Sequence, residues 1–122
     1  MSSALSWFEI PVRDLDRAHR FYSEVMQAEL RQETIGGNAM AIFPYAEGGI
    51  GGAIIAGGQH VPSTQGTIVY LDAGDDLDGA LARVEPAGGK VLMGRSLITE
   101  NIGSIAFIQD PEGNRVGLHS PH

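Results

Sequence analysis

The sequence contains no cysteine among its 122 residues. Disulfide bonds, cysteine-ligated zinc and thiol chemistry are therefore excluded. Basic residues are also scarce, because 8 Lys and Arg stand against 15 Asp and Glu, which gives a formal net charge of −7. Nucleic-acid phosphates and anionic membrane surfaces bind clustered positive charge, so the composition disfavours both kinds of partner.

Long apolar runs are missing as well, since no stretch approaches the roughly 20 residues that a membrane-spanning helix needs. The first residues carry neither the basic segment nor the apolar stretch of a signal peptide. We therefore expect a soluble, cytoplasmic protein. The length suits one domain, residues 1–122, and the 43% share of hydrophobic residues is enough to form a core without covalent links.

The chain reads as two similar halves. Short segments of the first half recur in the second, shifted by 62 or 65 positions. A repeat of this kind predicts two copies of one structural unit. We divide the chain into a first module at about 5–57, a linker at 58–66 and a second module at about 67–120. The matching segments are 14–18 with 76–80, 41–43 with 106–108, 47–48 with 112–113, and Gly52 with Gly117.

Hydrophobic periodicity and turn residues predict a strand, a helix and then further strands in each half. The first half begins with a strand at 7–12 and a helix capped by Asp14, and the second with a strand at 67–72 and a helix capped by Asp76. Pro86 and the glycines that follow it end the second helix. Further strands are predicted at 39–44, 50–56, 91–93, 104–109 and 114–119, with a tight turn at 110–114.

This layout resembles the vicinal-oxygen-chelate superfamily, which includes glyoxalases, bleomycin resistance proteins and dioxygenases. Three motifs carry the resemblance, which covers about residues 5 to 120: Val12-Arg13-Asp14-Leu15-Asp16-Arg17-Ala18 followed by Phe21-Tyr22, Ala87-Gly88-Gly89, and Phe107-Ile108-Gln109-Asp110-Pro111-Glu112-Gly113-Asn114. The resemblance implies an α+β fold in which two tandem βαβββ modules form a curved mixed sheet around a cavity. It also implies a homodimer.

The resemblance further implies where a metal would bind. Metal-dependent members take His, Gln or Glu ligands from the first and fourth strands of each module. Alignment of the motifs places these four positions at Trp7, Gly52, Thr67 and Gly117. None of these side chains is a usual ligand for a divalent ion, so we expect no metal cofactor.

Five residues are expected to line the cavity: Trp7, Glu9, Val69, Phe107 and His119. Trp7 is either a flat apolar wall for an aromatic ligand or ordinary core. Glu9 is either a buried acid with a raised pKa or an edge-strand residue that reaches water. His119 is either a proton carrier in the cavity or a frayed terminal residue. By its parity, we expect Tyr70 to pack under the second helix.

Two functions follow from these candidates, and the sequence leaves open whether the protein is an enzyme. The first is a glyoxalase-like protein that binds a small molecule without a metal, because sequestration needs only an enclosed pocket and a few placed polar groups. The alternative is a lyase, isomerase or dioxygenase that uses a divalent metal. It requires Glu9 and His119, the two catalytic candidates, to converge with a third ligand such as His60 from the linker. Loss of activity in favour of partner binding is a third possibility.

Overall fold

The computed structural model describes residues 3–122. Along the chain the elements are β1 (Trp7–Val12), α1 (Leu15–Met26), β2 (Arg31–Ile35), β3 (Asn38–Ile42), β4 (Gly51–Ala56), β5 (Tyr70–Asp72), α2 (Leu77–Val84), β6 (Lys90–Thr99), β7 (Gly103–Gln109) and β8 (Arg115–Ser120). Within the described residues, no helix combines the length and the hydropathy needed to cross a membrane.

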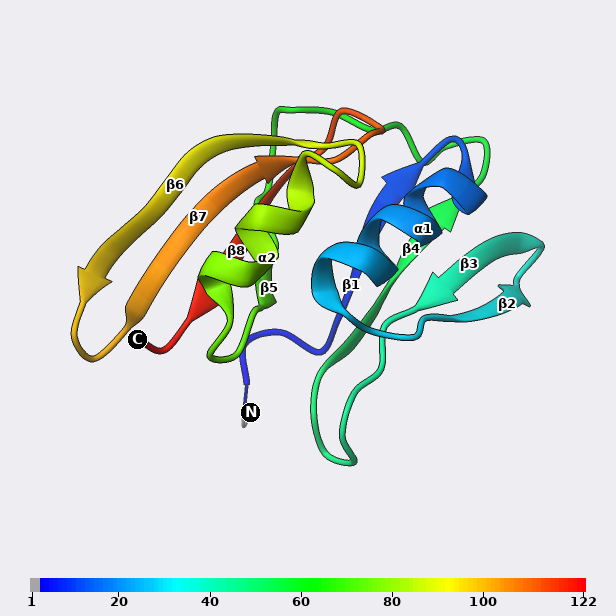
Figure 1. Cartoon of the computed structure of the whole chain (residues 1–122). Helices are drawn as coiled ribbons and strands as arrows, with labels where there is room; N and C mark the ends of the chain where they lie inside the picture. Colours follow the sequence, from blue (N-terminus) through cyan, green and yellow to red (C-terminus); the bar gives the residue numbers. More distant parts are fainter. Residues whose placement is uncertain (1–2) are drawn as a thin grey trace.

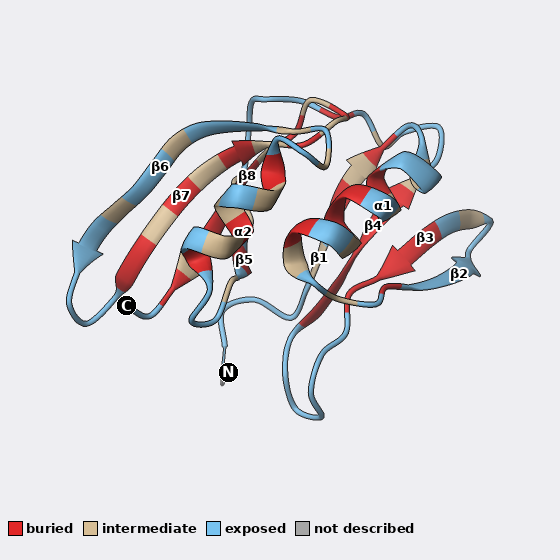
Figure 2. Cartoon of the chain, viewed as in Figure 1, coloured by how far each residue is buried: buried red, intermediate tan, exposed pale blue. Residues whose placement is uncertain are grey.

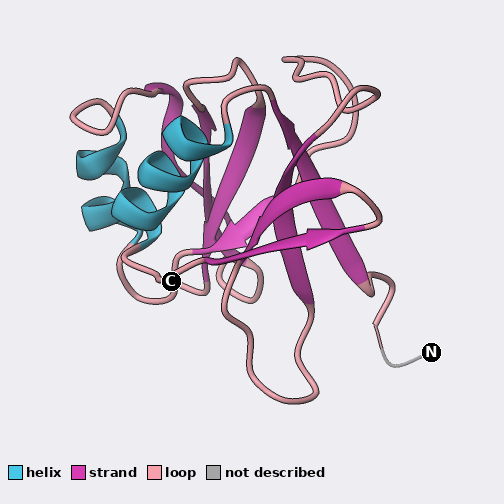
Figure 3. Ribbon diagram, turned by 90° about the vertical axis from the view of Figure 1, so that its right-hand side faces the viewer, coloured by secondary structure: helices cyan, strands magenta, loops and turns pink. Residues whose placement is uncertain are grey.

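The strands form two four-stranded sheets with the same topology. Their orders are β1-β4-β3-β2 and β5-β8-β7-β6. In each sheet the first strand of the module runs parallel to the fourth, and the other pairs are antiparallel. The predicted α+β fold with two βαβββ modules is therefore confirmed. Both helices cover the same face of the two sheets (Figures 1 and 3).

Each helix begins at the predicted aspartate, but only one of the two caps works as expected. The Asp14 carboxylate accepts a hydrogen bond of 3.1 Å from the Arg17 N–H in the first turn of α1. The Asp76 carboxylate makes no such bond at the start of α2. It instead accepts a 3.0 Å hydrogen bond from the guanidinium of Arg83, which lies in the last turn of the helix. The prediction of a side-chain cap at Asp76 is therefore wrong.

The larger of the two buried hydrophobic clusters lies between the helices and the sheets. The buried face of α1 carries Phe21 and Tyr22, and alternate strand residues pack beneath it. In β1 these are Ile10 and Val12, which are 3% and 1% exposed. Because successive side chains of a strand point to opposite faces, this pattern fixes which strand residues face away from the helices.

The predicted strand boundaries are wrong in three places. β2 was not predicted, because its five residues are all exposed and show no apolar alternation. β6 runs from Lys90 to Thr99 rather than over 91–93, since it is an edge strand whose pairing with β7 continues through several register shifts. β5 covers only Tyr70–Asp72. Thr67 and Val69, which precede it, line the seam between the two modules, although the Val69 carbonyl still accepts a hydrogen bond from the Gly117 N–H. Figure 2 shows that β2 and β6 are exposed along most of their length.

The turn at 110–114 fastens the second module to the first. The carboxylate of Glu112, whose side chain is 1% exposed, accepts hydrogen bonds from the backbone N–H groups of Arg13 and Asp14 and from the Arg17 guanidinium. Arg13 and Asp14 directly precede α1, and Arg17 lies in its first turn. One buried carboxylate therefore accepts hydrogen bonds from the N-terminal end of a helix in the other module and from the residues just before it.

Two further side chains of this turn add to the connection. Asp110 accepts a 2.6 Å hydrogen bond from the buried Tyr22 hydroxyl of α1. The Asn114 amide donates to the Pro11 carbonyl at 2.7 Å, and its oxygen accepts from the Ser63 N–H of the linker at 3.1 Å. Burial, followed by the charge of Asp110 and its hydrogen bond, raises the pKa of Tyr22 well above 10, so the hydroxyl remains a donor.

Replacing Glu112 with Gln tests this connection. Burial by itself raises the pKa of Glu112, but the hydrogen bonds from the Arg13 N–H and the Arg17 guanidinium outweigh it, so the net shift is downward. The carboxylate therefore stabilises the fold above its unfolded pKa, and this stability is lost as the pH falls through its folded pKa. We expect Glu112→Gln to lower the free energy of unfolding at pH 7 by about 1–3 kcal/mol and to flatten the acid limb of the stability profile.

Denaturant unfolding at pH values from 7 to 3 measures both effects. The matched control is Glu47→Gln, because Glu47 occupies the repeat-equivalent position in the first module but is exposed in a loop. That change should stay within about 0.5 kcal/mol of the wild type. If the acid limb of the stability profile of Glu112→Gln is the same as in the wild type, the Glu112 carboxylate does not connect the modules as described.

Candidate functional site

The face of the two sheets opposite the helices, called here the open face, collects most of the predicted site residues. It carries the strand residues that alternate with the buried core. From the first module these include Trp7, Glu9 and Gly51, and from the second Tyr70, Phe107, Arg115, Gly117 and His119.

The register of β1 and β4 corrects one predicted ligand position. Trp7 pairs with Gly51, whereas Phe8 pairs with Gly52. A Cβ added to Gly52 would come within 2.2 Å of the Phe8 ring, and Phe8 packs against the core on the helix side. The prediction that Gly52 faces the cavity is therefore wrong, because a shift of one residue moves a side chain to the other face of a sheet. Gly51 takes that place.

The second module has a similar correction. Tyr70 pairs with Gly117 on the open face, so it does not pack under α2 as predicted. Its neighbour Leu71 is 6% exposed and joins the core, which fixes the phase of the strand. Val69 shares the face of Leu71 and packs against the core, although it also lines the seam. Thr67 precedes the strand.

Aromatic rings lie over the open-face glycine in both modules. A Cβ on Gly51 would come within 2.6 Å of the Tyr45 ring and 2.9 Å of the Trp7 ring. A Cβ on Gly117 would come within 2.3 Å of the Tyr70 ring. The space that a side chain at either glycine would need is therefore filled by an aromatic ring. These rings also pair with each other, since Trp7 meets Tyr45 edge-on at 6.5 Å and Tyr70 lies 5.9 Å from Phe107.

The donors on the open face do not fit a divalent metal. Glu9 accepts a 3.3 Å hydrogen bond from the Trp7 indole and lies 3.9 Å from the His60 Nε2. His119 belongs to the other sheet, where its Nε2 is 2.5 Å from the Ile102 carbonyl oxygen. Across residues 3–122, no three His, Asp or Glu side chains are grouped so that they could hold a metal ion. The convergence that the metal-dependent alternative requires is not formed, and we derive no chemistry through a metal.

Exposure decides between the two interpretations of Trp7 and Glu9. Trp7 is 38% exposed, so it is not ordinary core, and its ring lies on the open face. The Glu9 side chain is 39% exposed and lies in the edge strand β1, so its carboxylate reaches water. His119 is held inside β8, where it pairs with Asp72 and Ile105, and so is not a frayed terminal residue.

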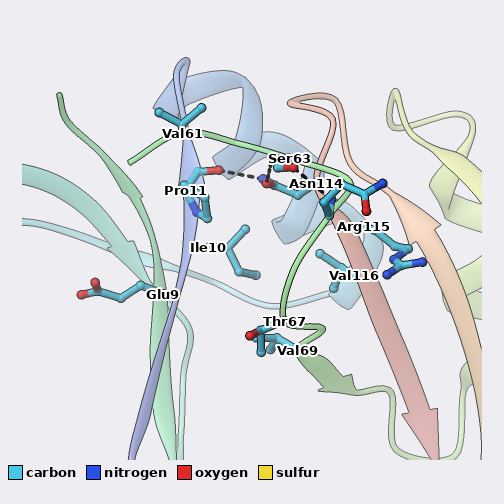
Figure 4. Close-up of a pocket in the computed structure, with 11 residues that line it drawn as sticks. Glu9, Ile10, Pro11, Val61, Ser63, Thr67, Val69, Asn114, Arg115 and Val116 are labelled. Atoms are coloured by element: carbon cyan, nitrogen blue, oxygen red, sulfur yellow. Dashed lines mark hydrogen bonds between the residues drawn. The ribbon is translucent and has the colours of Figure 1, made fainter. Parts of the chain in front are cut away.

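Arg115 is a candidate that the sequence analysis missed. Its guanidinium lies 5.8 Å from the centre of the Phe107 ring, and its Nε is buried without a hydrogen-bond partner. Alternation along β8 places Arg115 on the same face as Gly117. Nothing else in the sequence marked this charged residue, which lies beside a turn, as part of a site. Glu9 and Arg115 extend away from each other on the two sides of the seam (Figure 4). The open face therefore has a negative group in one module and a positive group in the other.

A small pocket lies between these two groups, at one end of the seam (Figure 4). Its volume is about 110 Å³. Ile10, Val69 and Val116 give it an apolar interior, and Thr67 adds a hydroxyl. The linker borders it through Val61, Ser63 and Gln65.

Substitution of Gly117 tests the contact with the Tyr70 ring. We expect Gly117→Ala to destabilise the protein by about 1–3 kcal/mol, because the new methyl group overlaps the ring. In a Tyr70→Ala background the same change should cost at least about 1 kcal/mol less. Thermal or denaturant unfolding of the four proteins gives this difference.

Gly94→Ala is the matched control, since a Cβ at this strand glycine meets nothing within 4 Å. It should leave stability nearly unchanged. An equal cost of Gly117→Ala with and without the Tyr70 ring would show that the ring does not occupy this space.

Comparison with known proteins agrees with this architecture. Residues 4–118 match the family model described as Glyoxalase/Bleomycin resistance protein/Dioxygenase superfamily. No curated protein matches the chain by sequence.

Solved structures resemble the chain over nearly its whole length. A glyoxalase/bleomycin resistance protein from Albidiferax ferrireducens T118 is 17% identical with a TM-score of 0.74, and covers 97% of this chain and 98% of its own. One from Streptomyces sp. CB03234 is 24% identical with a TM-score of 0.71, covering 95% and 99%. Glyoxalase I from Zea mays is 20% identical with a TM-score of 0.71, covering 94% of this chain and 43% of its own. At these identities the likeness shows the fold. Because the family model spans almost all of the sequence, the chain belongs to the Glyoxalase/Bleomycin resistance protein/Dioxygenase superfamily.

Proposed function

We propose that this protein binds a small aromatic molecule on its open face and does so without a metal ion. The observation that carries the proposal is the aromatic cover over Gly51 and Gly117. In both modules a ring stands beside a position that has no side chain. Trp7 and Tyr70, which are both partly exposed, offer flat apolar surface to a planar ligand.

The charged groups define the polar ends of this ligand. Glu9 stands beside the Trp7 indole, so a cationic group there gains both ion pairing and a cation–π contact. Arg115 is partly exposed and its guanidinium lies over the Phe107 ring, so a carboxylate or phenolate oxygen is a suitable acceptor for its N–H groups. A planar molecule with a cationic end at Glu9 and an anionic end at Arg115 matches both groups.

The size of the seam pocket limits how much of the ligand is enclosed. Drug-sized ligands occupy pockets of roughly 300–1,000 Å³, whereas this pocket holds about 110 Å³. Only a small substituent fits inside, and the rest of the ligand lies across the aromatic rings. Two of the similar bacterial structures carry bleomycin resistance in their names, so bleomycin is one candidate ligand to test.

Nuclear magnetic resonance (NMR) titration with two simple probes tests the proposal. Trp7 is the only tryptophan, so its indole N–H gives a single resolved signal beside Glu9. Benzyltrimethylammonium should shift this signal, and Glu9→Gln should weaken that binding by about two- to five-fold, as expected for an exposed ion pair. Benzoate should instead shift the side-chain signals of Arg115, and Arg115→Gln should weaken benzoate binding by a similar factor.

Each variant serves as the control for the other probe. Glu9→Gln should leave benzoate binding unchanged, and Arg115→Gln should leave benzyltrimethylammonium binding unchanged. If neither probe nor bleomycin perturbs open-face signals at millimolar concentration, the proposal is wrong.

Native mass spectrometry of protein from cells grown with nickel, zinc, iron and manganese tests the absence of a metal. We expect the mass of the chain without a divalent ion, and we propose that the protein is a homodimer. Retention of one ion per chain would overturn the proposal and favour a metal-dependent enzyme acting through Glu9 or His119.

A further inference from the structure

A second pocket lies on the helix side of the seam, where the start of β1 approaches β5 and the end of α1. Its volume is about 420 Å³, within the range of pockets that hold a ligand of drug size. We call it the helix-side pocket. Phe8, Met26, Phe43 and Leu71 form much of its wall. Its exposed members Leu5, Ile50 and Tyr70 mark the side that is open to solvent.

Small residues keep this pocket empty of side chains. Phe8 lies flat over Gly52, as the 2.2 Å approach of an added Cβ shows, and its ring is 5.7 Å from that of Phe43. The ring is therefore held against β4 and does not fill the space below α1. Ala28, which follows that helix, also contributes only a methyl group to the lining.

The chemistry of the lining selects one class of ligand. Apart from Asp72, the residues lining it are apolar or uncharged. Asp72 accepts a 2.8 Å hydrogen bond from the Gly74 N–H through one oxygen, and is exposed to solvent. From this we propose that the helix-side pocket is a second binding site, for an aromatic or alicyclic amine. The rings lie among Phe8, Met26 and Phe43, and the ammonium group lies at Asp72.

This site is separate from the one proposed on the open face. Neither Trp7, Glu9 nor Arg115 lines it, and the two surfaces share Tyr70 and Asp72, which lie on either side of the core residue Leu71 in β5. Its apolar walls also differ from the charged borders of the open face, because Asp72 is the single ionised group that the ligand meets. The second site can therefore be present or absent independently of the first.

The test uses methyl-labelled methionine and two probes with the same rings. Met26 lines the helix-side pocket, and its methyl signal is identified with a Met26→Leu variant. Titration with 1-naphthylmethylamine should shift this signal, and 1-naphthoate should bind about three- to ten-fold more weakly, since Asp72 attracts the first and repels the second. Asp72→Asn should reduce this preference to about unity.

A filling variant localises the ligand. Ala28→Phe places a ring in the pocket and should weaken amine binding reported by Met26 at least ten-fold, with no loss of melting temperature. Ala28→Phe should leave the ligand-induced shift of the Trp7 indole signal unchanged. Glu9→Gln should alter the Trp7 shift and leave the Met26 shift unchanged. These opposite responses distinguish failure at this site from failure on the open face.

Three results would overturn the proposal. One is a Met26 methyl signal that does not respond to millimolar amine. Another is a carboxylate that binds as tightly as the amine, and the last is amine binding that persists unchanged in a stably folded Ala28→Phe protein.

Discussion

The buried carboxylate of Glu112 is the interaction on which the arrangement of the two modules depends. In the described part of the chain the two sheets share no hydrogen-bonded strand pair, so no backbone ladder sets their relative position. Contacts between α1 and α2 and the turn at 110–114 do this instead. A buried charge is stable only when it is fully paired, and Glu112 finds its partners only at the start of α1. Both pockets lie along the seam that this contact holds in place.

The same seam explains how one fold offers two different surfaces. On the open face, glycines in β4 and β8 leave room for rings from Trp7, Tyr45 and Tyr70, so apolar walls stand where a metal centre would need oxygen or nitrogen donors. On the helix side, the absence of a side chain at Gly52 lets the Phe8 ring lie against β4, which leaves space beneath α1. Neighbouring glycines of one strand thus shape opposite faces, because side-chain positions alternate along it.

Local sequence patterns predicted much of the fold and part of the candidate site, and the features that they missed have physical explanations. The repeat and the motifs at 12–18 and 107–114 predicted the two modules correctly, and Asp14 caps its helix as expected. β2 escaped prediction because an exposed strand has no apolar alternation to recognise. Among the predicted site residues, Trp7 and Glu9 lie on the expected face, whereas Arg115 was missed because its contact with the Phe107 ring depends on the tertiary structure.

The sequence by itself determined the fold class and the two-module plan, since hydrophobic periodicity and turn motifs are local properties. Only the tertiary structure decided which of Gly51 and Gly52 faces outward and that Tyr70 lies on the open face. Strand register sets the face, and a shift of one residue reverses it. It also decided that Glu112 meets Arg17 and that Glu9 and His119 belong to different sheets, because these positions depend on strand pairing and on how the modules pack.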